Sequence, residues 1–125
     1  MISHLQAQSI LNKYGQAWIN QDTELLISLF SKDAVYAERQ HKKPYQGRDE
    51  IAAYWDEKVV SEQSNITFTL HNVYVDKNTV IDEFSASAYS SVKKQTVELE
   101  SVCVFDVNQE LFITNWREFW HSKWK

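Results

Sequence analysis

A carboxylate closes the short stretch in which the chain changes from helical to extended character. A helical pattern and a polar corner come first, and Val35 and Tyr36 then open a short strand that ends at Glu38. We expect this strand to lie along the wall of an internal pocket, with Glu38 placed to face a bound molecule. Desolvation in an aromatic pocket raises the pKa of a carboxyl group, which suits a general acid or base near neutral pH. The alternative is a solvated strand-end acid that pairs with Arg39 or Lys42.

Tyr14 and Ser101 are polar residues inside apolar patterns. Tyr14 lies on the apolar stripe of the first helical segment, so its hydroxyl either donates a hydrogen bond to a ligand oxygen or belongs to an ordinary core tyrosine. Ser101 interrupts an apolar strand face, and we expect its hydroxyl to point into the cavity. Because Ser101 has no base adjacent in sequence, we do not expect it to act as a nucleophile.

Glu118 shares a strand face with Trp116 and Trp120, because alternate residues of a strand point the same way. A charge between two tryptophans is costly unless it is paired or protonated. Two interpretations follow. Glu118 either meets Glu38 or Tyr14 across the cavity as one member of an acid–base site, or it belongs to a structural ion pair.

Aromatic residues make up 14% of the chain, including five tryptophans. Large flat side chains suit the lining of an apolar cavity, although they also fill ordinary cores. The aromatic residues that we expect to line a binding cavity are Trp18, Tyr36, Trp55, Phe68, Trp116 and Trp120.

Length and composition restrict the class of protein. A chain of 125 residues is expected to form one domain, residues 1–125, large enough to bury a core without a disulfide or a metal. Cys103 is the only cysteine, and the four histidines are scattered, so we expect no metal site. A net charge of −4 without a basic run argues against nucleic acid as a partner. No phosphate loop or nucleotide fingerprint is present, so we expect no organic cofactor.

The N-terminal residues lack the basic start and apolar run of a secretory signal, and no stretch is apolar enough to cross a bilayer. We therefore expect a cytoplasmic protein that does not use a membrane as a partner.

The elements that must position these residues are three helices and a sheet. Apolar residues spaced by three and four predict a helix over 5–20, a second helix capped by Asp22, and a third helix over 48–60. A polar loop is expected over 39–46. From Ser64 onward the alternation predicts four long antiparallel strands, with a bulge near residues 71–72 and a last strand over 111–121 followed by four fraying residues.

Both faces of this sheet carry apolar residues. Val102, Val104 and Phe119 have the opposite parity from the inward-facing set, so a second subunit is expected to cover the outer face in a homodimer. Asp82 and Glu83 point to opposite faces, and the pattern does not say which one points inward.

This order of elements resembles the SnoaL-like group of the nuclear-transport-factor-2-like, or ketosteroid-isomerase-like, superfamily. The matching positions are Tyr14, Ala17-Trp18, Leu29-Phe30, Asp33-Ala34, Tyr36, Pro44, Gly47, Ile51, Tyr54-Trp55 and the run Trp116-Arg117-Glu118-Phe119-Trp120. The resemblance implies an α+β fold: a cone-shaped, curved antiparallel or mixed sheet wrapped around three N-terminal helices, with an internal cavity.

The resemblance also implies roles for individual residues. Tyr14 falls at the position of the isomerase tyrosine and Glu38 at that of the base, but Ser101 occupies the position of the second oxyanion-hole acid. Trp120 corresponds to an aromatic residue of the pocket. Because one donor is missing, steroid isomerisation itself is not expected.

The expected function is binding of a small apolar molecule, with cofactor-free isomerase, dehydratase or cyclase chemistry in which Glu38 moves the proton. The alternative is a non-catalytic ligand-binding or dimerisation module.

Overall fold

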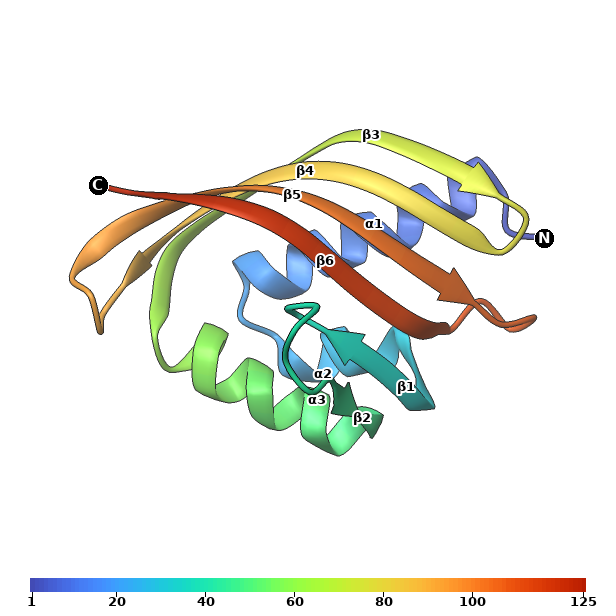
Figure 1. Ribbon diagram of the computed structural model, residues 1–125, viewed down its shortest axis with the longest axis horizontal. Coiled ribbons are helices and arrows are strands. Elements are labelled where there is room, and N and C mark those ends of the chain that lie inside the picture. The colour runs from blue at the N-terminus through green and yellow to red at the C-terminus, as the bar shows by residue number, and fades with distance from the viewer.

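A computed structural model describes all 125 residues of the chain and shows a curved sheet arched over helices (Figure 1). The elements follow in the order α1 (His4–Ile19), α2 (Thr23–Ser28), β1 (Phe30–Ala37), β2 (Tyr45–Gln46), α3 (Gly47–Trp55), the π-helical turn η1 (Asp56–Val60), β3 (Gln63–Asp76), β4 (Thr79–Ser90), β5 (Gln95–Val107) and β6 (Ile113–Trp124). The α+β class with three helices and a curved, unclosed sheet is confirmed.

The six strands form one mixed sheet in the order β2-β1-β6-β5-β4-β3. β1 runs parallel to β6, and every other neighbouring pair is antiparallel. Figure 1 shows the four long strands bending over α1, while α3 lies below them, next to β1 and β2. Strands β3 to β6 therefore form one wall of the interior, and the helices form the other.

Local signals explain where the helices begin. Ser3 forms a reciprocal capping box with Gln6, which satisfies the free N–H groups at the start of α1. Asp22 accepts a 3.1 Å hydrogen bond from the backbone N–H of Leu25 and so caps α2. α1 presents Tyr14 and Trp18, among other buried residues, to the interior.

Three expected boundaries are wrong. The first strand begins at Phe30, the expected end of the second helix, and includes the expected polar corner, because this segment pairs with β6 through a register shift between Phe30 and Val35. Residues 45–46 of the expected loop form the short strand β2 against β1. The C-terminal residues do not fray: backbone hydrogen bonds join Thr96 and Lys125 in both directions, and β6 extends to Trp124.

The strand pattern is otherwise confirmed. The pairing of β3 with β4 shifts register between Leu70 and Asn72, at the expected bulge. The turn between β3 and β4 contains Lys77 at a φ of 57°. Asp82 lies on the inner face and is fully buried, whereas Glu83 lies on the outer face and is partly exposed.

An aromatic cluster fills the core between α1 and the sheet. The ring of Tyr14 lies within 6.0 Å, centroid to centroid, of Trp18, Trp55, Phe68, Phe84 and Trp116. All five pairs are tilted or edge-on, which is a favourable geometry for aromatic rings. The cluster ties the first helix to strands that are distant in sequence.

The outer face of the sheet exposes apolar side chains, as expected. Tyr74 is 55% exposed, Phe119 44%, Ile81 40% and Val102 37%. No helix in the structure is long and apolar enough to span a membrane.

Candidate functional site

A cavity of about 490 Å³ lies between the inner face of the sheet and the helices. It is called the inner cavity below. More than half of its lining residues are hydrophobic, and they come from both walls of the fold. The lining comprises Tyr14, Trp18, Tyr36, Glu38, Arg39, Lys42, Tyr45, Tyr54, Trp55, Lys58, Val59, Gln63, Phe84, Lys93, Val97, Leu99, Ser101, Glu118, Trp120, Ser122 and Trp124.

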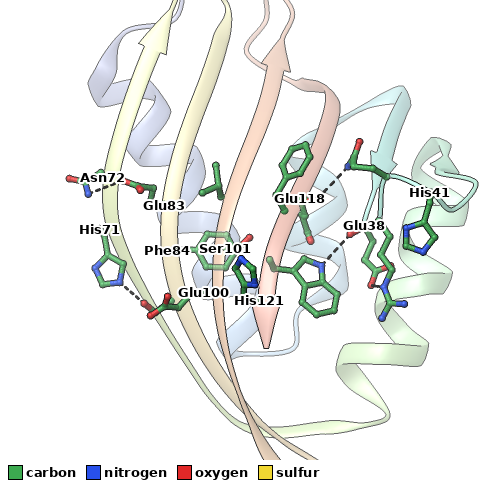
Figure 2. A pocket seen from close by; sticks show the side chains of 16 residues that line it. Glu38, His41, His71, Asn72, Glu83, Phe84, Glu100, Ser101, Glu118 and His121 are labelled. Atoms are coloured by element: carbon green, nitrogen blue, oxygen red, sulfur yellow. Dashed lines mark hydrogen bonds and ion pairs between the residues drawn. The ribbon is translucent and has the colours of Figure 1, made fainter. Parts of the chain in front are cut away.

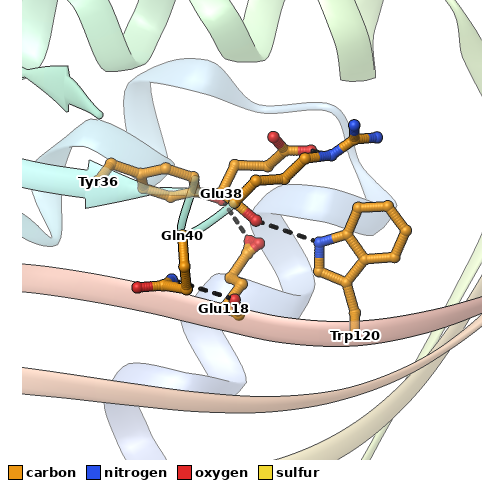
Figure 3. A network of polar contacts seen from close by, with 6 residues as sticks. Tyr36, Glu38, Gln40, Glu118 and Trp120 are labelled. Carbon is orange, nitrogen blue, oxygen red and sulfur yellow. Dashed lines mark hydrogen bonds and ion pairs between the residues drawn. The ribbon is translucent and has the colours of Figure 1, made fainter. Parts of the chain in front are cut away.

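Glu118 on β6 is the carboxylate with the most unusual surroundings. Its Oε1 accepts a 2.8 Å hydrogen bond from the hydroxyl of Tyr36 on β1, as Figure 3 shows. The two residues approach because the parallel pairing of β1 with β6 sets Tyr36 beside Trp116, two residues from Glu118 on the same face. No lysine or arginine forms an ion pair with Glu118. The structural ion pair considered for this residue is therefore not formed.

Burial and, to a smaller extent, the charge of Glu38 raise the pKa of Glu118 to about 7, while the hydrogen bond from Tyr36 opposes the increase. Glu118 in turn affects its neighbours. Burial is the main cause that raises the pKa of Tyr14, Tyr36 and Tyr54 above the ordinary value, and the charge of Glu118 is the second cause in all three. Glu118 can therefore exchange a proton near neutral pH, whereas the three tyrosines remain hydrogen-bond donors.

Glu38 lies just beyond the end of β1, and its side chain is 15% exposed. Its Oε1 lies 3.4 Å from Nε of Arg39, so it forms the ion pair that was the alternative interpretation. The backbone carbonyl of Glu38 accepts a 3.2 Å hydrogen bond from Nε1–H of Trp120 (Figure 3). This contact attaches the end of β1 to β6. Glu38 thus borders the inner cavity together with Glu118, while its charge is already partly countered.

Asp82 is a second buried carboxyl group on the inner face of the sheet. Strand pairing places Asp82 opposite Cys103, and Cys103 opposite Glu118, so the three residues form a row across β4, β5 and β6. Neither carboxyl oxygen of Asp82 has a hydrogen-bond partner. Burial and, to a smaller extent, the charge of Glu118 raise the pKa of Asp82 to about 8. Asp82 does not border the inner cavity.

Most of the expected site residues border the inner cavity. These are Tyr14, Trp18, Tyr36, Glu38, Trp55, Ser101, Glu118 and Trp120. Trp55 is nearly fully buried, and its Nε1–H has no hydrogen-bond partner.

Phe68 and Trp116 do not border the cavity, contrary to expectation. Phe68 packs on α1 so closely that a Cβ at Gly15 would lie 2.5 Å from its ring. Trp116 is fully buried and stacks on Phe105 at 5.2 Å. Both residues pack behind the side chains that line the cavity.

Sequence reasoning missed three residues near the site: Tyr45, Tyr54 and Asp82. Tyr45 and Tyr54 stack at 4.4 Å between centroids and line the cavity from the side of β2 and α3. Tyr54 was recognised only as a family position. Asp82 carried a signal, since it interrupts an apolar strand face as Ser101 does, but its parity was ambiguous.

A larger, more open depression of about 850 Å³ crosses the outer face of the sheet; it is called the outer groove below. Figure 2 shows His71, Glu83, Glu100 and His121 projecting from successive strands into it. Only four of its 16 lining residues are hydrophobic. The inner cavity is the better candidate site because it is more enclosed and richer in aromatic residues; Glu38 and Glu118 border both.

No group of three or more His, Cys, Asp or Glu residues is arranged to hold a metal ion. The polar groups of the inner cavity instead comprise two carboxyl groups, several hydroxyl groups and a set of cations at its opening. This arrangement can bind an apolar body and exchange a proton with it.

Comparison with known proteins agrees with the fold. A family model described as a SnoaL-like domain matches residues 11–115. No curated protein sequence matches the chain.

Several solved structures are similar. The epoxide hydrolase/cyclase-like enzyme SalBIII, described in pyran ring formation in the polyether salinomycin, is 18% identical with a TM-score of 0.83, covering 97% of this chain and 95% of that one. A Mycobacterium tuberculosis LEH-like epoxide hydrolase is 18% identical with a TM-score of 0.77, covering 94% and 84%. RV0760c from the same organism, in complex with estradiol-17β-hemisuccinate, is 17% identical with a TM-score of 0.78, covering 93% and 94%. At these identities the likeness establishes the fold alone.

Proposed function

This chain belongs to the SnoaL-like domain family, and on that premise we propose that it binds a small, largely apolar molecule in the inner cavity and performs cofactor-free acid–base chemistry on it. The reaction class is isomerisation, dehydration or cyclisation. The observation that supports this most strongly is the 2.8 Å hydrogen bond from Tyr36 to Glu118 in an aromatic cavity, next to Glu38 and without a cationic partner for Glu118.

In this proposal Glu118 transfers the proton. From the sequence, that role was expected for Glu38. A pKa of about 7 lets Glu118 both accept and return a proton at neutral pH. Tyr14 and Tyr54 border the same space and stay protonated, so either hydroxyl can stabilise a developing oxyanion. Glu38 acts as the second carboxylate, and Ser101 is a polar contact on the opposite wall.

The similar structures are consistent with this chemistry. They include an epoxide hydrolase/cyclase-like enzyme described in pyran ring formation and an LEH-like epoxide hydrolase. The complex of RV0760c with a steroid ester supports the view that this fold accommodates a flat apolar ligand. We propose that the protein carries out this chemistry in the cytoplasm.

A non-catalytic binding protein is the second candidate function, and the ion pair between Glu38 and Arg39 favours it. The experiment that separates the two candidates begins with mass spectrometry of small molecules that co-purify with the protein. The ligand found is then incubated with the wild type, with Glu118→Gln and with the control Glu100→Gln, which changes a carboxylate of the outer groove only.

We expect the wild type and Glu100→Gln to convert the ligand, and Glu118→Gln to lose conversion by about 100-fold or more while binding within a few-fold. Recovery of the ligand unchanged from the wild type would favour the binding protein. Equal conversion by Glu118→Gln and the wild type would contradict the role of Glu118.

The proposal also includes a homodimer formed through the outer face of the sheet. The exposed side chains of Tyr74, Ile81, Val102 and Phe119 lie on adjacent strands and form an apolar patch. An uncovered patch of this kind is typical of an interaction surface. A second copy could bury it through a two-fold contact.

A further inference from the structure

Four cationic side chains border the inner cavity, and three separate segments supply them. Arg39 and Lys42 come from the loop between β1 and β2, Lys58 from η1, and Lys93 from the turn between β4 and β5. All four residues are exposed, so they surround the opening and leave the depth of the cavity to the aromatic residues. This set is called the basic rim below.

The basic rim contrasts with the charge of the rest of the molecule. The chain carries a net charge of −4, yet the cavity lining contains four cations and only two carboxyl groups, Glu38 and Glu118. Electrostatic attraction toward an anion is therefore concentrated at this opening, on a protein that otherwise repels anions.

Two members of the basic rim have no anionic partner. Lys58 contacts Glu57 and Glu62, and Arg39 contacts Glu38. Lys42 and Lys93 form no ion pair with any carboxylate. Their charges are free to meet an anionic group that arrives with a ligand.

Tryptophans of the cavity wall hold two of these cations at the opening. Nζ of Lys93 lies 4.2 Å from the ring centroid of Trp124, and Cζ of Arg39 lies 5.3 Å from that of Trp120. Both tryptophans also border the inner cavity. A cation over an aromatic face is partly pre-positioned, so an apolar ligand body against the tryptophan and an anion against the cation would be bound together.

The interior of the cavity, unlike the basic rim, disfavours an anion. Glu118 lies deeper in the cavity, on β6, and its carboxylate repels an anion. A ligand with one charged end would therefore enter with its neutral body inside and its charge at the basic rim.

We infer that the molecule bound in the inner cavity is an apolar body with a carboxylate or similar anionic group at one end, which Lys42, Lys93 and Arg39 recognise at the opening. This inference rests on the proposed function, since it identifies the class of ligand for the same cavity. It makes the basic rim the element that selects for charge, while the aromatic wall selects for shape.

The chain offers a matched control for the test. Lys42 is followed by Lys43, and Lys93 by Lys94, but only the first lysine of each pair borders the cavity. The double variant Lys42→Gln/Lys93→Gln therefore has the same net charge as Lys43→Gln/Lys94→Gln, and the two differ in whether the cations face the ligand.

The probes are 1-naphthylacetate and its neutral isostere 1-naphthylacetamide, with affinity measured by calorimetry or by quenching of tryptophan fluorescence. We expect the wild type to bind the acid about five- to tenfold more tightly than the amide at low salt, and this preference to shrink with added NaCl. Lys42→Gln/Lys93→Gln should remove the preference without changing affinity for the amide. Lys43→Gln/Lys94→Gln should retain it.

Equal binding of the acid and the amide by the wild type would overturn the inference while leaving cavity binding intact. An equal loss of preference in both double variants would also overturn it, because the effect would then come from overall charge. If neither probe binds, the inference fails together with the proposed function.

Discussion

The hydroxyl of Tyr36 donates a 2.8 Å hydrogen bond to Oε1 of Glu118, and this contact joins two strands whose residues are 82 positions apart. The acceptor is a carboxyl group whose burial raises its pKa to about 7, and the donor is a tyrosine whose own pKa is raised by burial. The pair is the part of the structure on which the proposed chemistry depends.

Tyr36→Phe should raise the pKa of Glu118 above its value of about 7. The hydrogen bond stabilises the charged form of the carboxylate, so its removal favours the protonated form by about one pKa unit. The measurement is a pH titration followed by carboxyl ¹³C chemical shifts. Tyr45→Phe is the control, because Tyr45 also borders the cavity but makes no hydrogen bond to Glu118. An unchanged titration of Glu118 in Tyr36→Phe would contradict the assignment.

Asp82→Asn should stabilise the protein increasingly as the pH rises from about 4 to about 8. The pKa of Asp82 is raised from 3.8 to about 8 in the folded state, so the unfolded state loses its proton first and the wild type loses stability across this interval. We expect the variant to gain roughly 2–5 kcal/mol at pH 8 relative to pH 4. Urea unfolding at several pH values measures the difference.

Glu83→Gln is the neighbouring control for Asp82, because Glu83 lies on the outer face of the same strand. It removes a partly exposed carboxylate from the same strand and so controls for the loss of a charge there. If the free energy of unfolding depended on pH in the same way in Asp82→Asn and in the wild type, the raised pKa of Asp82 would be contradicted.

Gly15→Ala should destabilise the fold, although alanine is the better helix former by about 1 kcal/mol. A Cβ at this position would lie 2.5 Å from the ring of Phe68, which is held in the aromatic cluster around Tyr14. We expect a net loss of roughly 1–3 kcal/mol in the free energy of unfolding. Ser9→Ala, on the exposed side of α1, is the control and should have little effect. A Gly15→Ala variant as stable as the wild type would mean that the ring can move aside.

Phe119→Glu should reduce self-association if the outer face forms the proposed homodimer. Phe119 is 44% exposed in the apolar patch, and a charge there would have to be desolvated on dimerisation. Light scattering coupled to size-exclusion chromatography should show a shift from about twice the chain mass toward 14.7 kDa. Leu5→Glu is the control, since Leu5 is exposed on α1, away from this patch. A wild type of 14.7 kDa at all concentrations would contradict the homodimer.

The residue pattern alone was sufficient for most of the helices and strands. Apolar spacing and local caps such as Asp22 depend on nearby residues, so they predicted the three helices and the four long strands. The resemblance added the cone shape and the cavity. The predicted ends of strands were wrong where pairing with a neighbouring strand, and not local preference, determines them, as at Phe30 and at Trp124.

The candidate site was only partly predictable for the same reason. Strand alternation placed Glu118 with Trp120 on one face, which local geometry determines. It could not show that Tyr36 would be the partner of Glu118, because the parallel pairing of β1 with β6 brings those residues together.

Local residue patterns define the set of elements and the side chains that each element can present. Contacts between distant segments define which carboxyl groups are desolvated and which find a partner. Glu38 meets Arg39 near the opening, whereas Asp82 is buried without a partner, and Glu118 is held by a tyrosine. Burial depends on contacts among distant segments, and so does the pKa that burial sets.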